Sequence, residues 1–247
     1  MKTLSPDYYF NLSLFAHAEL FKDCVHVWEA LMRIKTYLLN LPLGKIEVDV
    51  PHGTFLINPE QISIGKGTVL EPGAYIKGPC VIGENCSVRH GAYIRGDFIA
   101  GNGCVIGHDT EVKNAVMLDK AQAGHFAYLG DTILGNRVNL GAGTKCANFR
   151  LDHMPVKVFF EGKNISTGLK KFGAIIGDES QLGCNSVTNP GSLIGKQVLC
   201  YPCINMGGVI PSRQIIRSNQ QIVMTPYSFR IKGFINPFKV VFFLRTD

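Results

Sequence analysis

Residues 64–123 read "IGKGTV LEPGAY IKGPCV IGENCS VRHGAY IRGDFI AGNGCV IGHDTE VKNAVM LDKAQA", which is a repeat of six residues. The first position of every hexad is aliphatic, and it is occupied by Ile64, Leu70, Ile76, Ile82, Val88, Ile94, Ala100, Ile106, Val112 and Leu118. A period of six fits neither a helix nor a simple strand alternation. Short strands of one hexad each, three to a coil of about eighteen residues, would stack and bury the aliphatic position. The stretch therefore predicts an all-β solenoid.

Glycine spacing agrees with this prediction. Gly65, Gly83 and Gly101 recur every eighteen residues, so they should stack at one corner, where a turn favours a residue without a Cβ. The hexads resume at Leu134 and again at Ile176, which gives about six coils over residues 59–212. Residues 147–173 carry no hexads and are predicted to form a loop extruded from the coils, either functional or a tolerated insertion.

Residues 1–58 are predicted to form a short helical segment. Apolar residues recur there at helical spacing, at Phe21, Val25, Trp28, Leu31, Ile34 and Leu38. We expect this stripe to pack against the solenoid or a partner subunit. Residues 213–247 are expected to form strands or loops that cover the end of the solenoid.

Composition indicates a globular protein without biased tracts, with 46% hydrophobic residues, 18% charged residues and 27 glycines. The net charge of +6 allows an anionic ligand, but the cations are scattered, so nucleic acid is not an expected partner. The first residues lack the features of a signal peptide, and no apolar run is long enough to span a bilayer. We therefore expect a cytoplasmic protein without membrane contact.

The cysteines are expected to be reduced and structural. Cys80, Cys86 and Cys104 occupy repeat positions that should point inward, as small hydrophobic residues would. Cys200 and Cys203 form a CxxC pair, which without a second pair is a weak signal for zinc or redox chemistry.

Three cations are predicted to form a column. Lys77, Arg95 and Lys113 are eighteen residues apart in succession, so regular coils would stack them at about 4.8 Å. Like charges at that spacing repel by about 1 kcal/mol per pair in water, which suggests a shared anion. The alternative is that the three side chains splay into solvent.

Two histidines share the same spacing. His90 and His108 are eighteen residues apart, and with His125 they could supply the three protein ligands of a catalytic zinc site. Surface histidines are the alternative, and no metal site is our main expectation.

The repeat loses its phase near His125. From Leu118 to Leu134 is sixteen residues, two short of three hexads, so the slip is expected within "AGHFAYLGD", residues 123–131. A coil that loses residues loses regular stacking, and such irregularities are common where a side chain faces a ligand. We therefore predict that this segment forms the active site.

Residues 111–148, "EVKNAVMLDKAQAGHFAYLGDTILGNRVNLGAGTKCAN", resemble the acetyltransferase domain of the bifunctional glucosamine-1-phosphate acetyltransferase and N-acetylglucosamine-1-phosphate uridyltransferase, a hexapeptide-repeat acyltransferase. The resemblance implies a left-handed parallel β-helix, a homotrimer with sites between subunits, and acetyl-CoA as acyl donor, with no tightly bound cofactor. It implies N-acylation of an amino sugar phosphate or nucleotide-linked amino sugar. A uridyltransferase domain is not expected, because the roughly sixty residues before the coils are too few to form one.

The resemblance implies roles for individual residues. His125 matches the general base, and an imidazole suits that task because histidine side chains titrate near neutral pH. Arg95 and Lys113 match cations that hold the sugar phosphate, and Lys77 extends their column. Asn148 matches a residue at the acetyl group or thioester, where a donor could stabilise an oxyanion.

The remaining matches concern the sugar and the coenzyme. Tyr128 and Asn139 are expected to hydrogen-bond the sugar, and Lys171 is expected to take the place of a further phosphate-binding lysine. Asn148, Phe149, Cys184 and Pro202 are expected to bind the coenzyme. Phe149 replaces a tyrosine of the family, Met154 stands where a lysine is expected, and Cys184 often corresponds to serine.

These departures leave two other functions open. One is a zinc protein similar to the γ-carbonic anhydrases, although the chain lacks their Gly-His-x4-His run. The other is a non-catalytic scaffold that binds a sugar phosphate.

Overall fold

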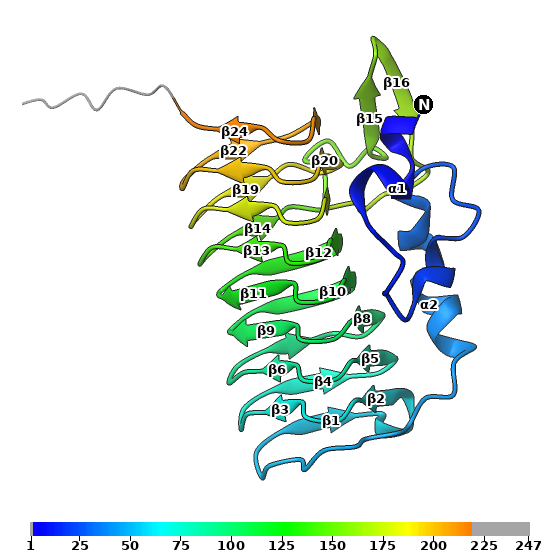
Figure 1. The fold of residues 1–247 in the computed structure, drawn as a ribbon, viewed down its shortest axis with the longest axis vertical. Helices are drawn as coiled ribbons and strands as arrows, with labels where there is room; N and C mark the ends of the chain where they lie inside the picture. The colour runs from blue at the N-terminus through cyan, green and yellow to red at the C-terminus, as the bar shows by residue number, and fades with distance from the viewer. Residues whose placement is uncertain (1, 219–247) are drawn as a thin grey trace, which may run out of the picture.

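The computed structural model describes residues 2–218, and in it the chain forms a three-sided parallel β-solenoid (Figure 1). The strand order within the sheets shows one strand per face in each coil, because every strand pairs with strands one coil below and above it. The predicted solenoid is confirmed.

We call the three sides face 1, face 2 and face 3, in the order in which the chain traverses them. Face 1 consists of β1 (Phe55–Ile57), β4 (Tyr75–Lys77), β7 (Tyr93–Ile94), the first half of β10 (Glu111–Met117), the first half of β12 (Tyr128–Leu134), β14 (Lys145–Cys146), β19 (Val187–Thr188) and β22 (Asn205–Met206). Face 2 consists of β2 (Ile62–Ile64), β5 (Cys80–Ile82), β8 (Phe98–Ala100), the second halves of β10 and β12, β17 (Ala174–Ile176), β20 (Ser192–Ile194) and β23 (Val209–Ile210).

Face 3 is a separate eight-stranded sheet. It consists of β3 (Val69–Leu70), β6 (Ser87–Val88), β9 (Val105–His108), β11 (Gln122–His125), β13 (Asn139–Leu140), β18 (Gln181–Leu182), β21 (Leu199–Cys200) and β24 (Ile215–Ile216). With a further rung at Ile46, which bridges to Ile64, the solenoid has about nine coils.

The expected number of about six coils was therefore too low. The solenoid begins before residue 59 and continues past residue 212, because coils at both ends form with sequences that do not repeat as hexads. Most of the segment 213–247, which was expected to cover the solenoid end, lies outside the described residues.

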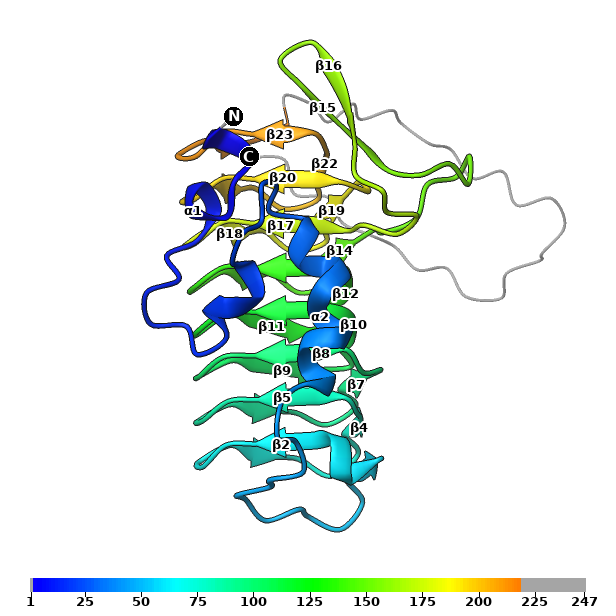
Figure 2. The same cartoon turned by 90° about the vertical axis from the view of Figure 1, so that its right-hand side faces the viewer.

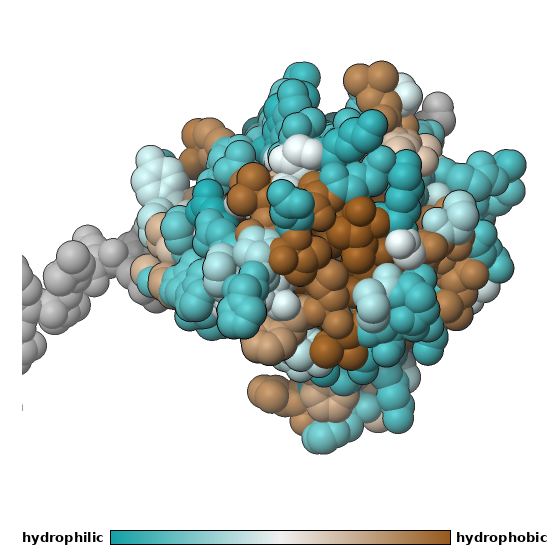
Figure 3. Space-filling model, turned by 90° about the horizontal axis from the view of Figure 1, so that it is seen from below, coloured by the Kyte–Doolittle hydropathy of each residue, from teal (hydrophilic) through white to brown (hydrophobic). Residues whose placement is uncertain are grey.

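The interior is a column of aliphatic, alanine and cysteine side chains. Cys80, Cys86 and Cys104 are buried in it, as the repeat predicts. At the lower end, residues 45–57 form an incomplete coil, and apolar side chains gather there (Figure 3). Ile46, Val48 and Leu56 are partly buried and pack against the interior.

Thiol reactivity should follow this burial. Burial raises the pKa of Cys80 to about 12 and that of Cys146 to about 11, whereas Cys184 and Cys203 are exposed. Because the thiolate is the reactive form, we expect iodoacetamide at neutral pH to label Cys184 and Cys203 within minutes, and Cys80 and Cys146 only after unfolding. Mass spectrometry of the peptides checks this, and rapid labelling of Cys80 in folded protein would contradict it.

The phase slip falls partly within the predicted residues 123–131, but not at His125. His125 pairs with His108 in a regular register, so residues 123–128 form a complete hexad. The residues are lost at the corner between faces 1 and 2, where Lys113-Asn114 and Gly130-Asp131 each replace a three-residue corner such as Arg95-Gly96-Asp97. As a consequence Met117, and not Leu118, points into the interior.

The N-terminal segment covers face 2 (Figure 2). It contains η1 (Lys2–Leu4), α1 (Pro6–Tyr9), η2 (Ala18–Phe21) and α2 (Glu29–Leu39), and η3 (Pro59–Gln61) follows it. Trp28 is buried against Phe172, and the segment packs on outward-facing residues of face 2 such as Val116 and Ile133. The apolar stripe was predicted too long, because the helix begins at Glu29 and Val25 is 64% exposed.

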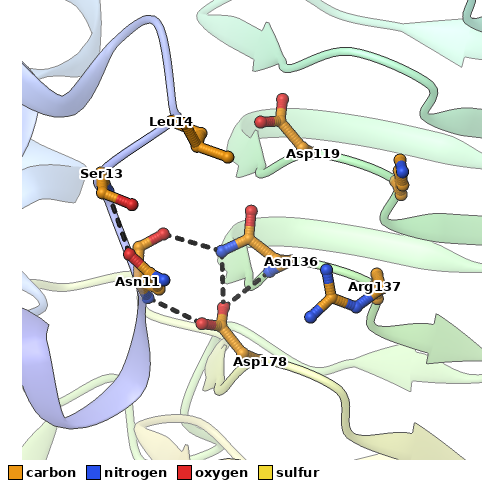
Figure 4. Close-up of a pocket in the computed structure, with 8 residues that line it drawn as sticks. Asn11, Ser13, Leu14, Asp119, Asn136, Arg137 and Asp178 are labelled. Carbon is orange, nitrogen blue, oxygen red and sulfur yellow. Dashed lines mark hydrogen bonds between the residues drawn. The ribbon is translucent and has the colours of Figure 1, made fainter.

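Asp178 anchors the N-terminal segment to the corner between faces 2 and 3, beside a polar cavity of about 160 Å³ (Figure 4). Its carboxylate accepts hydrogen bonds from the backbone N–H groups of Asn11 and Asn136, each at 2.7 Å. The side-chain amide of Asn136 donates to the Asn11 carbonyl at 2.9 Å. The two contacts made by Asn11 join residues more than 100 positions apart in the sequence.

Burial raises the pKa of the Asp178 carboxyl above its ordinary value of 3.8. The folded state therefore holds this proton more tightly than the unfolded state, so the contribution to stability is present below pH 3.8 and is lost as pH rises through the folded pKa. We expect the free energy of unfolding of wild type to fall relative to that of Asp178→Asn as pH rises from 3 to 6. Urea unfolding of both proteins at each pH measures the difference in their free energies of unfolding. A difference that is constant with pH, or that changes in the opposite direction, would contradict this prediction.

Residues 147–173 leave the coils between β14 and β17. They contain a β-hairpin, β15 (Lys157–Phe160) paired with β16 (Lys163–Ser166), which projects beyond the solenoid in Figure 1. Val156 and Val158 at its base are buried in the apolar cluster formed by the N-terminal segment. No helix among residues 2–218 has the length and apolar character needed to cross a bilayer.

Candidate functional site

A buried carboxylate organises the corner between faces 1 and 2. Asp131 is 3% exposed, and its oxygens accept hydrogen bonds from Lys113 Nζ at 2.9 and 3.2 Å. The side-chain amide of Asn114 donates to it at 2.9 Å, and that of Asn148 at 2.6 Å. The two short corners bring these residues together, since Asn114 and Asp131 both adopt the left-handed backbone conformation at equivalent positions.

Tyr128 lies over the same corner. A Cβ added at Gly130 would approach the Tyr128 hydroxyl to 2.6 Å and the Asn148 amide nitrogen to 2.5 Å, so glycine is needed there. The pKa of Tyr128 is raised, first by burial and then by the nearby Glu111 and Asp131 carboxylates. Tyr128 and Asn148, both predicted from the sequence, therefore meet above Asp131.

The cation column forms in register, but with a different charge balance from the one predicted. Lys77, Arg95 and Lys113 follow strand positions that pair from coil to coil. Arg95 donates to Glu111 at 2.7 Å and Lys113 pairs with Asp131, so protein carboxylates reduce the repulsion. Among residues 2–218, Lys77 forms no ion pair.

His125 ends β11 at the corner between faces 3 and 1 and is exposed. Its backbone carbonyl accepts a hydrogen bond from Gly143, and within the described part of the chain its imidazole has no hydrogen-bond partner. The next residue but two is Tyr128, on face 1. The imidazole is therefore open to contact with a ligand on that face.

His90 and His108 stack below His125. Their rings lie 5.8 Å apart and nearly parallel, and the Nδ1 atom of each is within 3.0 Å of a backbone carbonyl. Because a carbonyl oxygen only accepts, Nδ1 carries the proton in both rings. No three His, Cys, Asp or Glu side chains among residues 2–218 are grouped as metal ligands.

Another group of predicted residues lies on face 3. Asn139, Cys184 and Pro202 line one side of a shallow groove of about 450 Å³, together with Leu199 and Tyr201. This groove and the residues of face 1 are on different sides of the solenoid. Within one chain, the structure does not bring the face 3 residues together with Lys113 and Tyr128.

The insertion contributes Phe149 and Lys171, which form an isolated antiparallel bridge next to Asn148. A mainly apolar recess of about 550 Å³ is lined by Phe149, Leu151 and Pro190. Met154, which stands where a lysine was expected, is exposed on the same loop.

Sequence reasoning missed Asp131, Asn114 and Glu111. Asp131 ends the quoted motif and Glu111 begins it, but neither has a spacing that reveals its partner. A signal was present in the sequence, because two of its repeats are one residue short of six. Assigning each missing residue to the corner between faces 1 and 2 would have placed Asn114 and Asp131 one above the other.

Comparison with known proteins identifies the family. A family model described as the GMPPB C-terminal domain matches residues 76–158. A bifunctional sugar-1-phosphate nucleotidylyltransferase/acetyltransferase of Sulfurisphaera tokodaii is 42% identical over 92 residues, which are 37% of this chain and 23% of that protein. An uncharacterized acetyltransferase, YaiX, of Escherichia coli is 38% identical over 152 residues, 62% of this chain and 66% of that protein. The chain belongs to the hexapeptide-repeat acyltransferase superfamily.

The match to the first of these relatives spans less than a quarter of its length. Among solved structures, this hexapeptide-repeat protein is similar to the acetyltransferase domain of PglB from Neisseria gonorrhoeae, with 14% identity and a TM-score of 0.32 over 62% of this chain and 53% of that one. The fold is established by the strand pairing and not by this similarity.

Proposed function

We propose that the chain transfers an acetyl group from acetyl-CoA to the amino group of a phosphorylated or nucleotide-linked amino sugar, with His125 as general base. The observation that carries this is the exposed His125 imidazole, without a hydrogen-bond partner in the described residues, at the edge of the face that holds Tyr128, Arg95 and Lys113. The sugar-related and acetyltransferase names of the relatives support the reaction class.

The proposed chemistry is an acyl transfer. The sugar nitrogen attacks the thioester carbonyl, a C–N bond forms, the C–S bond breaks, and the proton leaves the nitrogen for His125 before passing to the departing coenzyme thiolate. Histidine suits this proton transfer because it titrates near neutral pH.

The cations remain able to bind a phosphate. Glu111 takes one N–H of the Arg95 guanidinium, which has five, and Asp131 leaves part of the Lys113 ammonium free. The carboxylates would hold both cations in place while their remaining N–H groups contact phosphate oxygens.

A second copy of the chain would complete the site. The predicted coenzyme residues Cys184 and Pro202 follow face 3 strands at the same corner as His125, two and three coils above it, whereas Tyr128 and the cations lie on face 1. Face 2 is covered by the N-terminal segment, so faces 1 and 3 are available for packing against other copies. A trimer in which face 1 of one subunit meets face 3 of its neighbour would join the two groups.

One assay tests the activity and the phosphate site together. Purified protein is incubated with acetyl-CoA and glucosamine 1-phosphate, glucosamine or other amino sugars, and thiol release is followed. We expect release with a phosphorylated acceptor, and we expect Arg95→Ala to raise KM about tenfold for that acceptor but not for glucosamine. Lys66→Ala, which removes an exposed cation outside the column, is the control. Absence of thiol release with every acceptor would reject the enzyme and favour a binding scaffold.

A further inference from the structure

Asp131 accepts hydrogen bonds from three side chains, which belong to the coils directly below and above it. Lys113 and Asn114 donate to it from the coil below, and Asn148 donates from the coil above. Both oxygens are used, and the group is almost completely removed from solvent. A carboxylate that faces an ammonium group offers acceptors only, so every group turned toward it must be a donor.

This fixes the amide of Asn148. Its nitrogen lies 2.6 Å from Asp131 Oδ2, so the side chain cannot turn over without placing oxygen against oxygen. Asn148 is 9% exposed, and its Oδ1 atom has no hydrogen-bond partner among the described residues. Asn148 therefore presents an acceptor, whereas the sequence predicted a donor to an oxyanion.

The polarity extends to Tyr128. The Asn148 amide nitrogen lies beside the Tyr128 hydroxyl, since a Cβ added at Gly130 would contact both, and an amide N–H turned to the phenol oxygen can only donate to it. The hydroxyl hydrogen is then available to point away from Asn148, toward a ligand on face 1. One carboxylate thus determines what two neighbouring side chains offer.

We propose that Asp131 is a positioning residue that makes Asn148 Oδ1 a hydrogen-bond acceptor and the Tyr128 hydroxyl a donor toward the acyl acceptor. The inference rests on the proposed function. In the proposed complex, Asn148 Oδ1 receives an N–H of the attacking amine and directs the nitrogen lone pair toward the thioester, while Tyr128 donates to an oxygen of the same sugar.

An exchange of the two residues tests this. Asp131→Asn combined with Asn148→Asp keeps the net charge and one amide–carboxylate hydrogen bond, but it reverses which residue donates. We expect kcat to fall about 100-fold in Asp131→Asn, because misplacement of reacting groups lowers rates by about that factor. The double variant should have the same low kcat. A KM change below about threefold is expected in both. Return of kcat to within threefold of wild type in the exchange would show that Asp131 only balances charge, and would overturn the proposal.

A second test does not depend on folding of the Asp131 and Asn148 variants. The sugar hydroxyl that Tyr128 contacts is identified with deoxy analogues of the acceptor. Removal of that hydroxyl should lower kcat/KM in wild type but cause no further loss in Tyr128→Phe. Fluorine at that position still accepts a hydrogen bond but cannot donate one, so we expect the fluoro analogue to keep a higher kcat/KM than the hydrogen analogue. Equal losses would overturn the proposed polarity. If wild type releases no thiol with any acceptor, the proposed function itself has failed, which is a separate result.

Discussion

His125→Ala is expected to lower kcat for acetyl transfer by about 10²–10⁴-fold, the usual contribution of a general base. The side chain is exposed and has no hydrogen-bond partner in the described part of the chain, so its removal leaves the fold intact. The loss should therefore appear in kcat, with the melting temperature nearly unchanged, because surface substitutions alter stability by about 0.5 kcal/mol or less.

The matched control for this variant is His90→Ala. His90 occupies the equivalent corner position two coils below His125 and is also exposed. It should keep wild-type activity. Partial recovery of His125→Ala activity on addition of free imidazole would identify the missing group as a base. Equal thiol release by wild type and His125→Ala on every acceptor would contradict the assignment.

Mixing two inactive variants is expected to restore activity if the site lies between subunits. His125→Ala removes the base at the corner between faces 3 and 1, and Cys184→Trp places a large ring in the face 3 groove. In a mixed trimer, a site is intact when His125 comes from one subunit and an open groove from its neighbour. Random mixing at equal amounts would make about a quarter of the sites intact, since each of two independent contributions is correct in half the cases.

The measurement is thiol release after the two variants are unfolded together and refolded, compared with each variant refolded alone. A control mixture of His125→Ala with Asn139→Ala tests another face 3 residue of the same groove. No recovery in a mixture shown to contain mixed trimers would place the whole site within one chain. In that case the face 3 groove of a neighbouring subunit would not contribute to the reaction.

The solenoid was predictable because its core is set by one repeated position. A strand that is buried on its inner side must present an apolar side chain at that position in each coil, so the pattern is visible in the sequence. The end coils were not predictable, because the sequences around Ile46 and Ile215 do not follow the hexad pattern. Their strands are recognised only by their pairing with the neighbouring coil.

The position of the phase slip illustrates the limit of the pattern. Met117 and Leu118 are both apolar, and either could be read as the inward residue. Only the strand register places Met117 inside and Leu118 against the N-terminal segment. The prediction set the whole slip within residues 123–131, whereas one residue is lost at Gly130-Asp131, inside that stretch, and the other at Lys113-Asn114, outside it.

By itself, the sequence determined the repeated core and the cation column, because periodicity fixes which side chains share a side of the solenoid, and its resemblance to the acetyltransferase domain supplied the other candidate residues of face 1. Only the tertiary structure decided how those side chains are used. Asp131 turns Asn148 into an acceptor and occupies part of Lys113 through contacts between adjacent coils. The N-terminal segment covers face 2 through contacts that have no period. Hydrogen-bond polarity and burial depend on neighbours in space, and a one-dimensional repeat does not specify them.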